Sequence, residues 1–326
     1  MELSLGILDQ SPIPEGFSAG DALRNSLDLA RMADNLGYTR FWLAEHHGAA
    51  SLACASPEVM IGPVALATSR LRVGSGGVML PHYSPLKVAE SFSMLEGLFP
   101  GRIDLGLGRA AGTSARIAHA LQRDRRYSPP DDFPDQLDEL AGLLEGHGGP
   151  GATIFAQPAI WLLGSSEQSA IWAAERGLPY AFADFINPEG AEYARWYRRN
   201  FVSRGGSVPR VIVAVSAICA DTDAEAMQLS LSQRMALLML FRGRTIPIPP
   251  VARAAEFLKG EGMPPEVLPV GRRMITGSPV RVKAAIEKVA TDYGADEALV
   301  VCNTHEHSAR RRSIELIAMA FGLSPQ

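Results

Sequence analysis

The sequence predicts an α/β fold, specifically a (β/α)8 barrel formed by one domain that spans residues 1–326. Short, continuously apolar segments alternate with longer amphipathic segments, and the apolar segments number eight. Continuous apolar runs are typical of parallel strands that are covered on both faces. A doubly wound open sheet is the alternative. The count of eight, and the absence of a nucleotide-binding glycine fingerprint after the first segment, favour the barrel.

The strands are expected where the apolar runs are short and rich in β-branched or aromatic residues. In chain order they are 3–8, 40–44, 71–80, 102–108, 160–164, 179–183, 211–218 and 297–302.

Helices are expected between the strands. Segment 19–37 has leucines at helical spacing and closes on a glycine. Other segments open on Ser-Pro or Pro, where proline presets φ for the first turn and serine can cap the free amides. These openings predict helices over 56–69, 84–98 and 278–294, and one after residues 131–134.

Two connections exceed an ordinary crossover and are predicted to be insertions on the barrel. Residues 109–131 are polar and rich in arginine, and residues 241–278 are rich in proline and glycine. The second insertion is a candidate lid over the site.

Composition argues against several classes of protein. A net charge of -4 gives no basic surface for nucleic acid. Cys54, Cys219 and Cys302 lie far apart, which predicts a reducing compartment and neither a disulfide frame nor a thiolate zinc site. The N-terminus has no basic signal region, and no apolar run approaches the roughly 20 residues that span a bilayer. We therefore expect a cytoplasmic protein with no membrane or nucleic-acid partner.

Functional groups of a β/α barrel lie at the carboxyl ends of its strands. Glu45, His46 and His47 directly follow the second strand and are candidate acid/base groups. Glycines in the third strand, including Gly76 and Gly77, indicate either close approach of a planar ligand or a bend.

The next two strands end in groups that suit an anion. Arg109 follows the fourth strand and can bind a phosphate or carboxylate through two hydrogen bonds. Gly164, Ser165 and Ser166 lead into a helix, whose free amides can bind an anion. Each feature also has a purely structural alternative: a packed histidine, a bend, a helix cap or a solvated arginine. Their convergence predicts a site for a flat, phosphorylated cofactor, with an apolar mouth formed by Trp42, Met79, Phe182 and Phe185.

His305 and His307 flank Glu306 after the last strand and could bind a metal together with His46 or His47. A polar cap on the last helix is the favoured alternative, because the chain lacks a regular metal signature. No metal site is predicted.

The segments "LDQSPIPEG", "GYTRFWLAEHHG", "LRVGSGGVMLPHYSPLKVAE", "LFPGRIDLGLGRAAGT" and "IWLLGSSEQSAIWAAERGLPYAFA" resemble the luciferase-like flavin-dependent monooxygenases of the bacterial luciferase superfamily. The resemblance covers nearly the whole chain and is weakest over 241–278. It is greatest to the single-chain subgroup that includes antibiotic-tailoring monooxygenases.

The resemblance implies a barrel that binds FMN at the strand ends, with His46 assisting flavin-oxygen chemistry. It implies a non-prolyl cis peptide at Gly76–Gly77 and phosphate contacts from Arg109, Ser165 and Ser166. From the residues and the resemblance together, we assign Glu45, His46 and His47 to catalysis, and Gly76, Gly77, Met79, Arg109, Gly164, Ser165 and Ser166 to cofactor binding.

The resemblance further implies a two-component monooxygenase that uses reduced FMN and O2 on a small organic substrate, such as an aromatic or polyketide compound. A separate NAD(P)H-dependent flavin reductase would supply the reduced FMN, and the chain would form a homodimer through the helices after the second and third strands. Gly108 stands where the luciferase α chain has a reactive cysteine, and "GTSA" lacks its acid, so light emission is not expected. The alternatives are a deazaflavin-dependent oxidoreductase, a metal-dependent barrel hydrolase and a non-catalytic flavin-binding protein.

Overall fold

Eight parallel strands close into a barrel, as predicted. A computed structural model describes residues 3–109, 115–121, 132–147, 154–264, 268–269 and 271–324. The last barrel strand pairs with both the first strand and the seventh, which closes the ring. In order around the barrel the strands are β1 Ser4–Asp9, β2 Arg40–Leu43, β3 Arg72–Ser75, β5 Ile103–Gly108, β6 Ala159–Gly164, β7 Tyr180–Ala183, β8 Val211–Cys219 and β10 Glu297–Val301.

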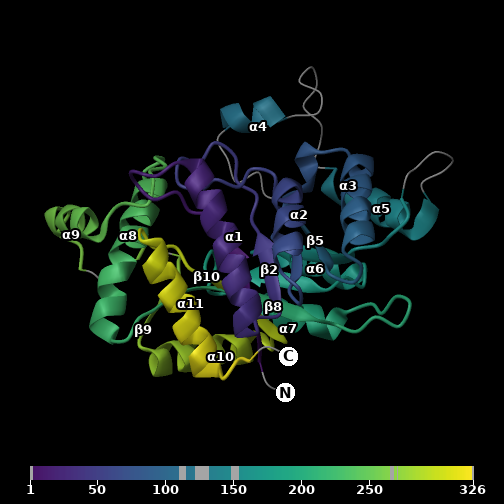
Figure 1. Ribbon diagram of the computed structural model, residues 1–326. Coiled ribbons are helices and arrows are strands. Elements are labelled where there is room, and N and C mark those ends of the chain that lie inside the picture. The colour runs from purple at the N-terminus through teal and green to yellow at the C-terminus, as the bar shows by residue number, and fades with distance from the viewer. Residues whose placement is uncertain are drawn as a thin grey trace.

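Helices follow the strands and cover the outside of the barrel (Figure 1). They are α1 Ala19–Leu36, α2 Pro57–Ala67, α3 Pro85–Leu98, α4 Ala115–Leu121, α5 Phe133–Gly142, α6 Glu167–Glu175, α7 Ala191–Asn200, α8 Asp223–Phe241, α9 Val251–Gly260, α10 Pro279–Tyr293 and α11 His307–Phe321. A 3-10 turn, Leu80–His82, and a π-helical turn, Leu143–His147, complete the described helical segments.

The helix ends follow the predicted chemistry. Ser18 and Asp21 form a reciprocal capping box at the start of α1, and Gly37 ends the helix in the left-handed conformation with φ 89°. Pro57, Pro85 and Pro279 occupy the first turns of α2, α3 and α10. These positions lack an intrahelical acceptor for an N–H group, so proline costs nothing there.

The third strand is shorter than predicted. The expected run 71–80 is divided into β3 and a short β4, Val78–Met79, by a cis peptide between Gly76 and Gly77. A Cβ atom on Gly77 would lie 2.8 Å from the Gly106 carbonyl oxygen. The backbones of the two neighbouring strands therefore approach closely here, which confirms the bend that the glycines suggested.

The second insertion is more ordered than its composition indicates. It contains α9 and a strand that sequence analysis missed, β9 Ile275–Gly277, which pairs with the end of β8. In the first insertion, residues 110–114 and 122–131 lie outside the described residues, so the expectations placed on them stay untested.

A buried ion cluster fills the amino-terminal end of the barrel. The Arg40 guanidinium contacts both Asp104 and Glu297, and Arg72 also binds Asp104. The indole of Trp42 donates to Asp104 at 3.0 Å. Because a buried cation is tolerated only when it is paired and hydrogen-bonded, the two carboxylates offset the desolvation of Arg40. This cluster fills the amino-terminal end of the barrel, so a binding site can form only at the carboxyl end.

Within the described residues, no helix is both long enough and apolar enough to span a membrane. Cys54, Cys219 and Cys302 are free and buried.

Candidate active site

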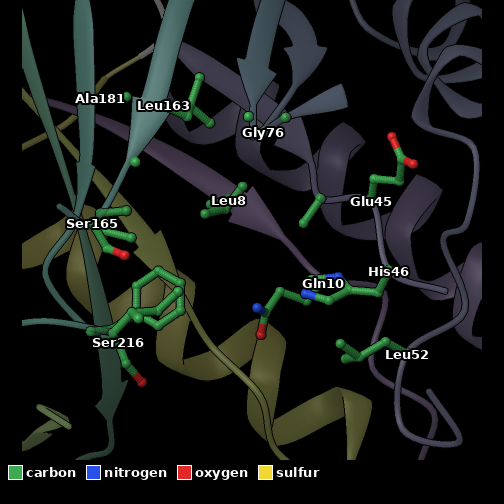
Figure 2. Close-up of a pocket in the computed structure, with 18 of the residues that line it drawn as sticks. Leu8, Gln10, Glu45, His46, Leu52, Gly76, Leu163, Ser165, Ala181 and Ser216 are labelled. Atoms are coloured by element: carbon green, nitrogen blue, oxygen red, sulfur yellow. The ribbon is translucent and has the colours of Figure 1, made fainter. Parts of the chain in front are cut away.

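A single large cavity of about 850 Å³ lies at the carboxyl ends of the barrel strands (Figure 2). This volume is near the upper end of the range for ligand pockets, so the cavity has room for a cofactor and a substrate together. Nine of the ten predicted site residues line it: Glu45, His46, Gly76, Gly77, Met79, Arg109, Gly164, Ser165 and Ser166. Residues at the carboxyl ends of the strands from β2 to β6 therefore line the same cavity.

His46 projects into the cavity beside Gln10 (Figure 2). Its backbone N–H donates to the Cys54 carbonyl oxygen at 2.9 Å. Burial, with a smaller effect of His47, lowers the pKa of the His46 imidazole to about 4. The ring therefore stays neutral from pH 7 down to about pH 5, where an imidazole with the unperturbed pKa near 6.5 would carry a proton. Its Nδ1 atom has no hydrogen-bond partner among the described residues.

The Glu45 side chain points away from His46 (Figure 2) and forms hydrogen bonds with neighbouring segments of the chain. Its Oε2 atom accepts the backbone N–H of Met79 at 2.9 Å. Its Oε1 atom accepts the Tyr83 hydroxyl at 2.8 Å and pairs with His47 Nε2 at 2.6 Å. The carboxylate thus ties the end of β2 to β4 and to the turn that follows.

Glu45 and His47 have surroundings that differ from those of His46. Both oxygens of Glu45 are occupied by protein groups, and its side chain is fully buried. His47 does not line the cavity, because its imidazole turns back to Glu45. Of the two histidines, only His46 lines the cavity, and the catalytic assignments of Glu45 and His47 stay predictions.

The wall of the cavity beside Gly76 is flat and apolar. Leu8 and Leu163 flank Gly76, and Ala181 extends the same surface (Figure 2). The Cβ atom of an alanine at position 76 would lie 2.4 Å from Leu8 Cδ1. Gly76 therefore leaves room for the Leu8 side chain, and the glycines and these apolar side chains together offer a surface that suits a planar ring system.

The anion-binding groups gather at the ends of β5 and β6. The Arg109 guanidinium lies 5.6 Å from the ring centroid of Trp172. Ser166 is the N-cap of α6 but makes no side-chain cap hydrogen bond, so its hydroxyl is available to a ligand. The Asn187 side-chain amide donates to the Ser165 carbonyl oxygen at 2.9 Å and fixes this loop. An arginine and a helix N-terminus at this spot suit a phosphate.

Sequence analysis missed the polar groups on the opposite side of the mouth. The Asn303 amide donates to Gln10 Oε1 at 2.7 Å, and the Gln233 amide donates to the Ser216 hydroxyl at 3.3 Å. Gln10 directly follows β1, and Asn303 lies two residues after the end of β10, so the strand-end rule applied to β2 could have found them. Gln233 lies on α8, and only the fold brings it to the cavity.

The second insertion contributes two arginines. Arg273 forms an ion pair with Asp184 at 3.0 Å. Arg272 lines the cavity and stacks on Phe241, 5.4 Å from its ring centroid. Burial lowers the pKa of Arg272, and its Nε atom has no hydrogen-bond partner among the described residues.

The remaining histidines are placed elsewhere. His305 Nε2 lies 3.1 Å from the Glu15 carbonyl oxygen, and His307 pairs with Asp28 at 2.7 Å. Neither lines the cavity. Within the described ranges, no three His, Cys, Asp or Glu side chains are grouped as metal ligands.

Comparison with known proteins gives a consistent result. The family model described as luciferase-like monooxygenase matches residues 3–297. The uncharacterized protein YwcH of Bacillus subtilis is 44% identical over 98% of this chain and 99% of its own length. The N-acetyl-S-alkylcysteine monooxygenase of the same organism is 34% identical over 98% of each chain.

Solved structures share the same barrel. The crystal structure of apo-MsnO8 superposes with a TM-score of 0.92 at 40% identity and covers 99% of this chain and all of its own. The oxygenating constituent of 3,6-diketocamphane monooxygenase from Pseudomonas putida, in complex with FMN, gives 0.75 at 19% identity over 99% of both chains. An F420-dependent secondary alcohol dehydrogenase gives 0.66 at 12% identity, covering 98% of this chain and 99% of its own. The last two likenesses concern the fold alone.

Proposed function

This chain belongs to the luciferase-like monooxygenase family, and we propose that it is an FMN-dependent monooxygenase that uses reduced FMN and O2 on a small organic substrate. The observation that carries the proposal is the convergence on one cavity of an apolar wall that contains two glycines, a phosphate-type anion site and a neutral histidine.

The cavity fits FMN group by group. Gly76 and Gly77 offer a wall against which a flat ring can lie. Arg109, with Ser165 and Ser166 at the start of α6, offers the charge and the donors that a phosphate requires. The 19% identical structure that contains FMN has the same fold, which adds fold-level support.

Bound reduced FMN supplies the electrons that activate O2, so that one oxygen atom enters the substrate and the other leaves as water. The residues of this chain would bind the flavin ring, exclude water from it and provide a hydrogen-bonding group beside it. His46 is suited to the last task as a neutral hydrogen-bonding group, because its pKa of about 4 keeps the ring uncharged at pH 7. Leu8, Trp42, Ala181 and Phe185 keep the space dry.

The substrate site is the remainder of the cavity. Its apolar side chains fit the organic substrate expected from the sequence, such as an aromatic or polyketide compound. The related N-acetyl-S-alkylcysteine monooxygenase suggests a thioether as a first test compound. We also propose, on family resemblance, that a separate NAD(P)H-dependent flavin reductase supplies the reduced FMN.

The proposed function is tested by measuring the transfer of oxygen from O2 to a substrate. Purified protein receives photochemically reduced FMN and isotopically labelled O2, with a panel of N-acetyl-S-alkylcysteines and aromatic compounds, and products are analysed by mass spectrometry. We expect one labelled oxygen atom in the product and a rate for His46→Ala at least about 10²-fold lower. Full coupled oxygen transfer by His46→Ala would remove the role assigned to this residue.

A deazaflavin-dependent oxidoreductase is the second candidate, because solved F420-dependent enzymes share the fold. Equilibrium binding of FMN and of F420 to the same preparation separates the two. Tight binding of FMN with weak binding of F420 supports the monooxygenase, and the reverse order contradicts it. Failure to consume oxygen with any reduced flavin would instead favour a non-catalytic flavin-binding protein.

A further inference from the structure

Four neutral polar residues form a continuous band on one side of the cavity mouth. We name this band, formed by Gln10, Ser216, Gln233 and Asn303, the amide arc. Its members come from the ends of β1 and β10, from β8 and from α8. The pairing of Val301 with Ser216 and of Ile7 with Val300 places these three strands side by side.

The amide arc lies opposite the proposed flavin site. In the closed ring of eight strands, β10 stands across the barrel from β5, and β8 stands across from β3. Gly76 and Ser216 accordingly lie on opposite sides of the space in Figure 2. Residues on β3, β5 and β6 would hold the cofactor, so the arc faces the part of the cavity that remains for a substrate.

Two members of the arc have a buried side-chain oxygen without a partner among the described residues. Asn303 and Gln233 are more than nine-tenths buried, with 5% and 7% of their surface exposed. Each uses its amide nitrogen within the arc, and neither Asn303 Oδ1 nor Gln233 Oε1 has a hydrogen-bond partner among the described residues. A buried acceptor without a donor is costly, and native structures keep few of them outside functional sites.

The free atoms define the ligand chemistry. Both are carbonyl oxygens, so they require N–H or O–H donors. Rotating either amide by 180° exchanges its oxygen and nitrogen, but one end of that amide still lacks a partner. The neighbouring surface is apolar, with Leu237 and Leu299 among the lining residues. The complementary molecule has an apolar body and at least one donor on it.

We propose that Asn303 and Gln233 are specificity-determining residues that bind an N–H or O–H group of the substrate. The substrate class is therefore an apolar organic molecule that carries an amide or a hydroxyl group. This inference rests on the proposed function, because it assigns the cofactor to the opposite side of the cavity. Gln10 and Ser216 act as positioning residues that orient the two amides.

The test uses two probes that differ by one donor. N-acetyl-S-benzylcysteine has an amide N–H, and its N-methyl analogue lacks it. Their dissociation constants are measured with FMN-loaded wild-type protein and with Asn303→Leu and Gln233→Leu. We expect the wild type to bind the N–H compound at least about tenfold more tightly, because a site built for a donor rejects the analogue that lacks it. Each leucine variant should reduce that preference to below about threefold.

Two further variants separate recognition from folding. Asn303→Asp keeps an acceptor and should retain most of the preference, which a damaged fold would not. Asn200→Leu removes an exposed amide on α7 that does not line the cavity and should leave the preference unchanged.

Three results would overturn the inference: equal affinity of the wild type for both probes, no binding of either probe, or leucine variants that lose FMN affinity instead of probe discrimination. The third result would assign the arc to the cofactor. Oxygen consumption with reduced FMN is measured on the same samples. This measurement tests the proposed function independently of the substrate recognition assigned to Asn303 and Gln233.

Discussion

At the scale of single residues, His46 shows how position and chemistry are set by different parts of the chain. Its place at a strand end could be predicted from the sequence, because the apolar run 40–44 stops directly before it. Its neutral state could not, since burial by distant segments lowers its pKa to about 4. The same limit applies to Glu45, whose direction is fixed by the Met79 N–H of another strand.

The lowered pKa of His46 predicts a pH-dependent stability of the cofactor-free protein. The unfolded chain binds this proton near pH 6.5 and the folded chain only near pH 4, so stability is lost as pH falls through that window. Between pH 7 and pH 5, the wild type should lose about 2 kcal/mol more unfolding free energy than His46→Gln. Urea unfolding at both pH values measures this, and parallel losses would contradict the buried, neutral ring.

Two glycines of β5 offer a matched pair for the close strand contact. A Cβ atom on Gly106 would lie 2.1 Å from the Ser75 carbonyl oxygen, whereas one on Gly108 would meet only the Val78 oxygen at 4.0 Å. We expect Gly106→Ala to lower the unfolding free energy by about 2–3 kcal/mol and Gly108→Ala to change it by less than about 0.5 kcal/mol. Equal effects in chemical denaturation would show that β3 and β5 do not approach as described.

At the scale of elements, most strands and helices could be predicted, and the errors have local causes. The run 71–80 has one apolar pattern but contains the Gly76–Gly77 bend, which its composition indicates without locating the break. The strand β9 was missed because it is three residues long and pairs only with the end of β8. Such a strand depends on a partner that is distant in sequence.

Glu45 is the link between β2 and β4, so its charge should matter to both the fold and the cofactor. In Glu45→Gln, the new amide nitrogen must face either the Met79 N–H or the Tyr83 and His47 side of the cluster. We expect a loss of about 1–3 kcal/mol in unfolding free energy and several-fold weaker FMN binding. Tyr83→Phe, which removes one donor and leaves the Met79 contact, should have a smaller effect.

Thermal unfolding and flavin fluorescence titration measure the two effects of Glu45→Gln. Unchanged FMN affinity in a destabilised Glu45→Gln protein would separate this carboxylate from the site.

At the scale of the whole molecule, the outward surfaces of α2 and α3 are unusually apolar. Val59 and Leu66 on α2, and Met94 and Leu98 on α3, are all more than half exposed. The two helices contact each other (Figure 1), and we propose that these side chains contribute to one surface. An exposed apolar patch of this kind marks an interaction site. It agrees with the homodimer expected from the sequence, which remains a proposal.

Light scattering tests this surface. We expect the wild type to be a dimer, and the double variant Leu66→Glu and Leu98→Glu to be a monomer, because two buried carboxylates per subunit would oppose association. Val280→Glu on α10 is the control, since this residue is 82% exposed but lies on another face. A monomeric wild type, or a double variant that stays dimeric, would contradict the assignment.

The central claim is that one cavity holds FMN with its ring against the glycine wall and its phosphate at the ends of β5 and β6. A crystal structure of the FMN complex tests this most directly. We predict the ring beside Gly76–Gly77 with His46 within hydrogen-bond reach, and the phosphate on Arg109, Ser165 and Ser166. A flavin bound with its phosphate beside Asn303, or with His46 turned away from the ring, would contradict the account.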